Sequence, residues 1–244
     1  DNANEIRRLI KENNFFLSLI EKIGVMTGTI MIHTRWASVG PVNLANSHPV
    51  NIISCGEDNQ KSQTLAMLNG DIYNYKEIIK NTNSLNASVI SKSDCTSDCL
   101  AIPAALVNIE KVSFEVINTI ASEFIGSFVI GVQHSTNPSD IVLVKKGIQG
   151  LYIGFSDDGF MFASDVYGLV ETCRYFYPID SDFSLRISAK KVPTIANINL
   201  TIVNHKTGLP VTLTREALKV TDITTRDIDK KGYRHFLEKE IHES

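Results

Sequence analysis

The spacing of apolar side chains predicts helices and strands along the first third of the 244-residue chain. Residues 5–22 carry apolar positions at the repeat of one helix face, which predicts a helix. The short apolar runs 28–33 and 64–70 predict two strands, and the second run ends in Asn-Gly. A second helix is predicted for 71–80, directly after that dipeptide.

In the middle of the chain, a polar loop is predicted to precede two further helices. Residues 82–94 are polar and predict a loop. One helix is expected to begin at Asp98, with Pro103 tolerated near its first turn. The second helix is predicted for 113–124.

Beyond Gly126 the pattern changes to short apolar runs separated by turn residues, which predicts antiparallel strands joined by hairpins. These runs are 127–133, 140–146, 151–156, 159–164, 174–179 and 197–203. A short helix is expected at 165–173 and a turn at 205–208. Helices flanked by antiparallel strands favour stacked sheets covered by helices, an α+β layered domain.

Composition narrows the classes of partner. The formal net charge is −3, which gives no reason to expect nucleic acid or a membrane surface. No apolar stretch approaches the ~20 residues that span a bilayer, and the first residues do not resemble a signal peptide. The four cysteines have no CxxC spacing and no companion histidine cluster, so free thiols are favoured over a disulfide or a metal site. They are Cys55, Cys95, Cys99 and Cys173.

Two short stretches place polar groups at the predicted ends of strands. In HTRWA, the guanidinium of Arg35 offers a fork of donors that suits a carboxylate. The alternative is a surface ion pair, with Trp36 filling the core. In LNG, the Asn69 amide and the Gly70 N–H could donate to an oxyanion. The alternative is a tight turn, for which Asn-Gly is a common signal.

A third stretch, SDCTSDC, precedes a predicted helix with Asp94, Thr96 and Asp98. A carboxylate at this point could hold an ammonium group, and the alternative is plain helix capping. His48 is a lone histidine before proline, a pattern that is most often structural.

Taken together, the motifs resemble a known family. HTRWASVG, NSHP, LNGDIYNY, a Thr/Ser/Asp cluster, GSFVI, KKG and FASDVYGL occur in this order. The chain resembles the class II, N-terminal-nucleophile glutamine amidotransferase domain, and most of all the glutaminase half of glutamine–fructose-6-phosphate aminotransferases. The ending KKGYRHFLEKEIHES is similar to the segment that joins this half to the sugar-isomerase half. The resemblance covers about residues 5–244, with a divergent stretch near 182–215.

The resemblance implies a four-layer αββα fold, with the amidotransferase domain at 1–228 and a linker at 229–244. It implies hydrolysis of glutamine and delivery of ammonia to a sugar-isomerase half that converts fructose 6-phosphate to glucosamine 6-phosphate. It implies no metal or organic cofactor, a cytoplasmic location, and a homo-oligomer formed through the sugar-isomerase half.

The resemblance also assigns roles to residues. It places Arg35 at the glutamine α-carboxylate, Trp36 and Ser38 in the pocket wall, and His48 among the pocket residues. It places Asn69 and Gly70 at the oxyanion hole. For the α-ammonium, a gap-free match selects Thr96, whereas a Thr-Ser-Asp spelling selects Asp98, which we favour because a carboxylate is needed.

The chain departs from the family at its nucleophile. The family uses an N-terminal cysteine whose α-amine acts as base, whereas this sequence starts at Asp1 and none of its cysteines fits that position. Two family histidines are replaced by Val39 and Leu68. We expect either a fragment, which the abrupt ending favours, or a natural variant without glutaminase activity, and the chain alone is predicted to be inactive. The alternatives are a non-catalytic regulatory or scaffold module, or a glutaminase that serves another keto-sugar acceptor.

Overall fold

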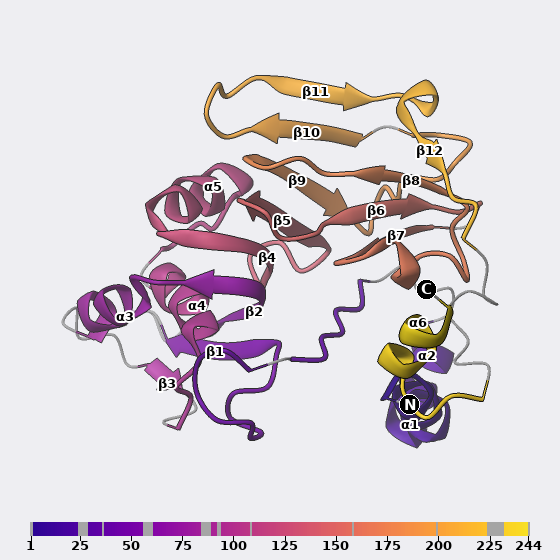
Figure 1. Ribbon diagram of the computed structural model, residues 1–244. Coiled ribbons are helices and arrows are strands. Elements are labelled where there is room, and N and C mark those ends of the chain that lie inside the picture. Colours follow the sequence, from indigo (N-terminus) through magenta and orange to yellow (C-terminus); the bar gives the residue numbers. More distant parts are fainter. Residues whose placement is uncertain are drawn as a thin grey trace.

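The computed structural model describes most of the chain, namely residues 2–23, 29–35, 37–55, 61–83, 89–91, 94–107, 109–157, 159–198, 200–223 and 232–243. Two antiparallel sheets form its body (Figure 1). The large sheet has the order β11 (Pro210–Leu213), β10 (Leu200–Asn204), β9 (Phe183–Ser188), β5 (Asp140–Lys146), β4 (Gly126–His134), β2 (Lys61–Ile72), β1 (Val50–Cys55), β3 (Val89–Ser91). The small sheet has the order β12 (Lys219–Val220), β8 (Tyr175–Pro178), β6 (Tyr152–Phe155), β7 (Phe160–Ala163).

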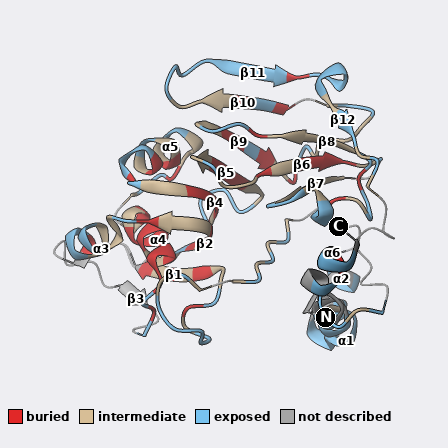
Figure 2. Cartoon of the chain, in the orientation of Figure 1, coloured by how far each residue is buried: buried red, intermediate tan, exposed pale blue. Residues whose placement is uncertain are grey.

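The large sheet lies between two hydrophobic cores. One core packs it against helices α3 (Tyr75–Asn83), α4 (Ala101–Leu106) and α5 (Phe114–Glu123), and the other packs it against the small sheet. Because successive side chains of a strand point to opposite faces, Phe128 and Ile130 of β4 enter the first core and Val129 enters the second. Burial on both faces explains why the central strands read as unbroken apolar runs (Figure 2).

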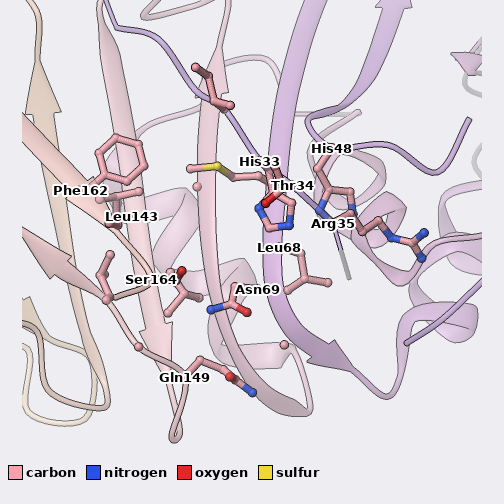
Figure 3. Close-up of a pocket in the computed structure, with 18 of the residues that line it drawn as sticks. His33, Thr34, Arg35, His48, Leu68, Asn69, Leu143, Gln149, Phe162 and Ser164 are labelled. Carbon is pink, nitrogen blue, oxygen red and sulfur yellow. The ribbon is translucent and has the colours of Figure 1, made fainter. Parts of the chain in front are cut away.

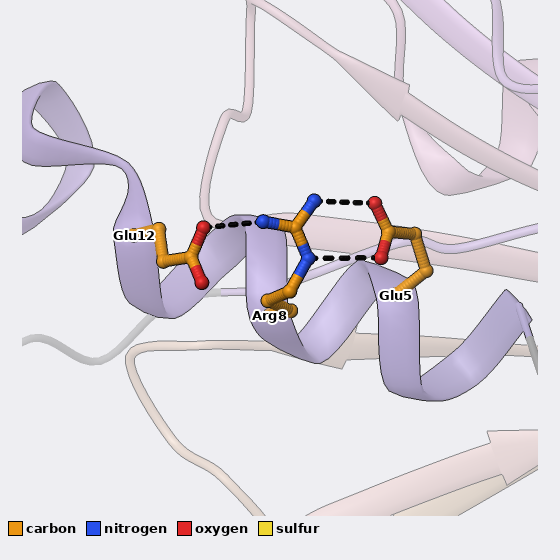
Figure 4. A network of polar contacts seen from close by, with 3 residues as sticks. All are labelled: Glu5, Arg8 and Glu12. Carbon is orange, nitrogen blue, oxygen red and sulfur yellow. Dashed lines mark hydrogen bonds and ion pairs between the residues drawn. The ribbon is translucent and has the colours of Figure 1, made fainter.

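The predicted single helix at 5–22 is wrong in one respect, because the structure has two helices there. They are α1 (Asn2–Glu12) and α2 (Asn14–Ile23), separated at Asn13. Arg8 supports α1 by donating to Glu5 at 2.9 and 2.6 Å and also to Glu12, one turn away on either side (Figure 4). Such exposed ion pairs stabilise a helix only weakly. In the view of Figure 1, α1 and α2 gather with α6 (Phe236–Glu243) at one side of the sheets.

Three further predictions about the first half are corrected. The expected strand at 28–33 is absent from its described part, since residues 29–35 form no regular secondary structure. Asn69-Gly70 is not a turn, because β2 continues to Ile72 and stays paired with β4 beyond Gly70. Helix α3 therefore starts at Tyr75 and runs to Asn83, inside the predicted loop. The described part of that loop also contains β3.

The second half follows the sequence pattern more closely. Strands β4 to β8 and β10 lie within about two residues of their predicted positions. Helix α5 begins after Ser113, whose hydroxyl accepts a hydrogen bond from the Val116 N–H at 3.3 Å. The predicted helix at 165–173 is only a short 3₁₀ turn, η2 (Val166–Gly168). Strands β1, β9, β11 and β12 were not predicted. Within the described residues, every helix is too short or too polar to cross a bilayer.

Candidate functional site

A cavity of about 470 Å³ opens beside β2 at the point where β1 begins. The pairing of β1 with β2 extends only to Val50 and Ala66, so residues 67–72 have a paired strand on the β4 side alone. The described lining residues lie in the segment before β1, in β2, at Asp98, and on strands and loops of the two sheets that face each other (Figure 3). We call residues 29–49, without Trp36, the rim segment; Trp36 lies outside the described residues. The rim residues in the lining are Ile32, His33, Thr34, Arg35, Ser38 and His48.

Asn69 and Gly70 reach the cavity from β2, a strand held along its length by β4. Figure 3 draws the Asn69 amide toward the cavity, across from Ser164. Gly70 has φ +105°, and a Cβ there would lie 2.2 Å from the Ser127 carbonyl oxygen, so only glycine fits. The tight-turn alternative for this dipeptide is thereby wrong.

The backbone of β2 turns polar groups toward the open edge. The N–H of Ile72 points away from β4 and donates to a carboxylate oxygen of Asp98 at 2.9 Å. Alternate peptide groups of a strand face the same edge, so we expect the Gly70 N–H on this side as well.

Asp98 presents a buried carboxylate to the cavity, with 3% of the residue exposed. The 3₁₀ turn η1 (Asp98–Leu100) is capped by Ser97, whose hydroxyl accepts from the Cys99 N–H at 3.3 Å. The capping alternative for Asp98 and Thr96 is therefore wrong. Burial raises the pKa of Asp98, and Asp71 adds to the rise, while the Ile72 N–H opposes it. Within the described part of the chain, this carboxylate forms no ion pair.

Thr96, the other candidate for the ammonium site, is exposed and does not line the cavity. The structure thus places Asp98, and not Thr96, at the cavity.

Arg35 lines the cavity, but its guanidinium is held by the rim backbone. It donates to the carbonyl oxygens of Pro41 at 3.2 Å and Gly40 at 3.5 Å, and to that of Val39. Among the described residues, Arg35 makes no ion pair, so the surface-pair alternative has no support there.

Ser38 and His48 join the rim to its neighbours. The Ser38 hydroxyl donates to Asp71 at 2.5 Å. The His48 ring lies 3.3 Å, Nε2 to Oγ, from Ser97, and its centroid is 4.7 Å from that of the His33 ring. Burial lowers the pKa of His48 to about 4, with further contributions from His33 and Arg35. The pKa of His33 is lowered by burial and by Arg35, so both rings are neutral near pH 7.

Comparison with known proteins identifies a matching domain family. Residues 56–171 match the model of the glutamine amidotransferase domain. The resemblance predicted from the motifs is confirmed for this domain.

Curated relatives extend the similarity beyond the amidotransferase domain model. Glutamine–fructose-6-phosphate aminotransferase [isomerizing] from Clostridium tetani is 30% identical over 244 residues, covering 98% of this chain and 36% of that protein. The enzyme of the same name from Neisseria meningitidis serogroup A is 28% identical over 221 residues, 90% of this chain and 33% of that protein. The chain thus spans about a third of the length of these relatives.

Solved structures with the same fold support the predicted fold class. Glutamine phosphoribosylpyrophosphate amidotransferase from B. subtilis superposes with a TM-score of 0.53 at 14% identity, over 71% of this chain and 34% of that one. A structure described as the allosteric regulatory enzyme of purine biosynthesis gives 0.52 at 16% identity, over 65% and 32%. At this identity the likeness establishes the fold alone.

The sequence motifs did not select several residues that line or support the cavity. Asn46, with 0% exposure, lies between the rim and residues 96–97, although it is the first letter of NSHP. His33 was visible as the first letter of HTRW. Gln149 and Ser164 line the cavity from loops after β5 and β7, and only the KKG and FASDV motifs beside them signalled this region.

Two of the described thiols, Cys99 and Cys173, are unsuited to nucleophilic attack. Cys95, Cys99 and Cys173 are buried and form no disulfide. Burial raises the pKa of Cys99 well above its usual range, and raises that of Cys173 to about 11. A thiol must ionise to attack, so the raised pKa values of Cys99 and Cys173 disfavour them as nucleophiles. In the described residues, no group of three or more His, Cys, Asp or Glu side chains gathers as a metal site would require.

Proposed function

We propose that this chain is the glutaminase half of a glutamine-dependent aminotransferase, in which the cavity binds L-glutamine for hydrolysis. The observation that carries the proposal is the buried Asp98 carboxylate beside the open edge of β2, where Asn69 and Gly70 also lie. A ligand that carries both an ammonium group and a side-chain amide matches this arrangement.

The α-ammonium of glutamine would pair with Asp98. A buried carboxylate is costly unless a cation compensates it, and the described residues supply none. The raised pKa of Asp98 reflects that cost. Binding an ammonium group would therefore offset the cost of burying the Asp98 carboxylate.

The α-carboxylate would meet Arg35. The carbonyls of Val39, Gly40 and Pro41 leave the Nε–H and one Nη1–H of its guanidinium for a ligand, as far as the described residues show. Ser38 and His48 would complete this end, with Trp36 as the predicted wall.

The oxyanion of the tetrahedral intermediate would be stabilised by the Asn69 amide and the Gly70 N–H. Donors fixed before the reaction are effective because they need no reorganisation when charge develops, and pairing with β4 fixes this strand. The attacking group would be the thiol of the family's N-terminal cysteine, with its α-amine as base.

The acceptor of the ammonia is proposed from the relatives. They are named glutamine–fructose-6-phosphate aminotransferase, which supports a sugar-isomerase half that uses fructose 6-phosphate. We propose residues 1–228 as the glutaminase domain and 229–244, which include α6, as the connection toward that half.

Binding is the direct test. Turnover of glutamine would need the family's N-terminal cysteine, and none of the cysteines in the 244 residues fits that position. L-Glutamine would be titrated into the 244-residue protein by isothermal calorimetry, together with Asp98→Asn and Thr96→Ala. Asparagine keeps an acceptor for the Ile72 N–H and removes only the charge. We expect Asp98→Asn to weaken binding at least about 30-fold, equivalent to ~2 kcal/mol for a buried charge pair.

Thr96→Ala is the matched control and is expected to leave the affinity within about twofold, the range of a surface substitution. Absence of glutamine binding to the unaltered protein would overturn the proposal. Equal affinities for the unaltered protein and Asp98→Asn would remove Asp98 from the ammonium site.

A further inference from the structure

A single buried side chain, Asn46, joins the two segments that carry the opposite charges of the cavity. Its amide oxygen accepts the N–H groups of Thr96 at 2.7 Å and Ser97 at 3.0 Å. Its amide nitrogen donates to the Pro41 carbonyl at 2.9 Å. With 0% exposure, the side chain makes these bonds in a site closed to solvent, where each lost bond leaves an unsatisfied group.

The partners of Asn46 are also the supports of the two charges. The Pro41 carbonyl accepts from the Arg35 guanidinium at 3.2 Å, so Arg35 and Asn46 share one oxygen. On the other side, Ser97 precedes Asp98 and caps the turn in which Asp98 lies. The chain of contacts therefore runs from the Arg35 guanidinium through the Pro41 carbonyl and the Asn46 amide to Ser97, which is joined by a peptide bond to Asp98.

Regular secondary structure does not fix this spacing, because the described rim before β1 has none. The other described contact of the rim with Ser97 is the His48 ring at 3.3 Å, a longer approach than the bonds of Asn46. The rim also packs tightly at Gly40, where a Cβ would lie 2.7 Å from the Thr96 hydroxyl and 3.0 Å from the Asn46 amide nitrogen. The distance between the two charges thus depends chiefly on Asn46.

We propose that Asn46 is a positioning residue that presets the separation between Arg35 and Asp98, and thereby selects ligands that carry both an α-carboxylate and an α-ammonium. The inference rests on the proposed function. When two charges are held at the spacing of the ligand, the second contact forms at a high effective concentration. When the spacing fluctuates, a ligand with both charges loses this advantage, whereas a ligand with one charge has none to lose.

Three ligands separate these contributions in calorimetric titrations of the 244-residue protein. They are L-glutamine, 4-carbamoylbutanoate, which lacks the ammonium, and 4-aminobutanamide, which lacks the carboxylate. In Asn46→Ala we expect the preference for glutamine over each analogue to fall about tenfold. This fall is modest beside the gain of about 10²–10⁴ in affinity that two linked contacts can confer. The affinity for each single-charge analogue should change less than about threefold.

Two further variants control for folding and for the loop itself. Asn46→Asp keeps an acceptor for the N–H groups of Thr96 and Ser97 and removes the amide that donates to the Pro41 carbonyl and to the Thr96 hydroxyl at 3.1 Å, so a folded Asn46→Asp protein should still lose preference. Ser47→Ala removes an exposed hydroxyl that donates to the Asn43 carbonyl at 3.0 Å, and should leave the preference within about twofold. Thermal denaturation of each variant reports its fold.

The outcomes distinguish this inference from the function on which it rests. If the unaltered protein fails to bind glutamine, the proposed function falls, and the inference falls with it. If the unaltered protein binds glutamine and both Asn46 variants keep the full preference, only the inference is overturned. An equal loss of affinity for all three ligands would likewise overturn it, since that result reports a structural role alone.

Discussion

The two halves of the cavity are built by different means. Asn69 and Gly70 belong to β2, a strand of the large sheet that is paired with β4 from Thr64 to Ile72. Arg35, Ser38 and His48 belong to the rim segment, which has no regular secondary structure before β1 and is fixed by hydrogen bonds from side chains. Strand pairing and two apolar cores fix the first half, and a few polar bonds fix the second.

This difference separates the tasks of the two halves. A paired strand moves little, which suits groups that must meet a developing oxyanion with no reorganisation. A rim held by individual polar bonds can adjust more easily, because local opening is easiest where buried apolar contacts are few. We therefore expect changes in the sheet half to affect folding and rate, and changes in the rim half to affect ligand binding and pH response.

The largest effect is expected on stability, when alanine replaces a glycine of positive φ in each half of the cavity. At Gly70, φ +105°, a Cβ would lie 2.2 Å from a strand carbonyl oxygen, so Gly70→Ala should lower the free energy of unfolding by about 3–5 kcal/mol. At Gly40, φ +78°, the nearest atom is the hydroxyl of exposed Thr96 at 2.7 Å, which can rotate away. Gly40→Ala should cost about 1–3 kcal/mol. Urea denaturation measures both.

Gly208 supplies the control for backbone strain, because its φ is +69° and no atom lies within 4 Å of a Cβ there. Gly208→Ala should cost about 1–2 kcal/mol, the strain of a left-handed conformation alone. If all three variants lost the same stability, backbone conformation would decide the cost, and the rigidity assigned to the sheet half would have no support.

The next effect is on rate and concerns Asn69. In a protein that carries the family's N-terminal cysteine, Asn69→Ala should lower kcat for glutamine hydrolysis about 10²–10³-fold and change KM little, as expected for one oxyanion donor. The Asn69 side chain makes no hydrogen bond within the described residues, so the circular dichroism spectrum should be unchanged.

Ser38→Ala provides the matching test in the rim. It removes the 2.5 Å bond to Asp71, and we expect it to raise KM with little change in kcat. A larger loss of kcat from Ser38→Ala than from Asn69→Ala would contradict the division of tasks between the halves.

The sequence predicted the sheet half better than the rim. The stretches 128–132 and 141–144 contain no polar side chain because both faces of these strands are buried, so their pattern identifies strands without knowledge of their partners. The predicted strand at 28–33 fails because Ile30 and Ile32 are 59% and 53% exposed, and only Met31 of this run packs against a core. No pattern in the run itself distinguishes these cases.

For the site, motif reasoning selected residues that the fold brings together but misjudged their supports. Arg35, Ser38, His48, Asn69, Gly70 and Asp98 all line one cavity, and their roles stay predictions. The Asn-Gly signal pointed to a turn because local propensity cannot include the pairing with β4. Asn46 was not selected because its contacts lie about fifty residues away in sequence, and short-range patterns contain no information on such contacts.

The smallest effect concerns pH and again compares the two halves. His48 of the rim has a folded-state pKa of about 4, whereas an unfolded histidine titrates near ~6.5. As the pH falls from 6.5 toward 4, the unfolded state takes up a proton that the folded state refuses, so stability decreases across this window. His48→Gln should reduce the acid loss by about 1–2 kcal/mol, allowing for solvent screening of a partly exposed ring.

The sheet half offers a matched histidine, His134, whose pKa is lowered by burial alone. His48 instead faces His33, Arg35, Ser97 and the backbone of Leu68, and electrostatic interactions with His33 and Arg35 lower its pKa further. The Asp98 carboxyl affects stability in the opposite sense, because its raised pKa favours the folded state at low pH. Asp98 is present in every variant, so its contribution cancels when the variants are compared. Urea denaturation from pH 8 to pH 4 should therefore show a larger relief of acid loss for His48→Gln than for His134→Gln. If the two variants behaved alike, burial alone would set both shifts, and Arg35 would not act on the His48 ring as the rim geometry implies.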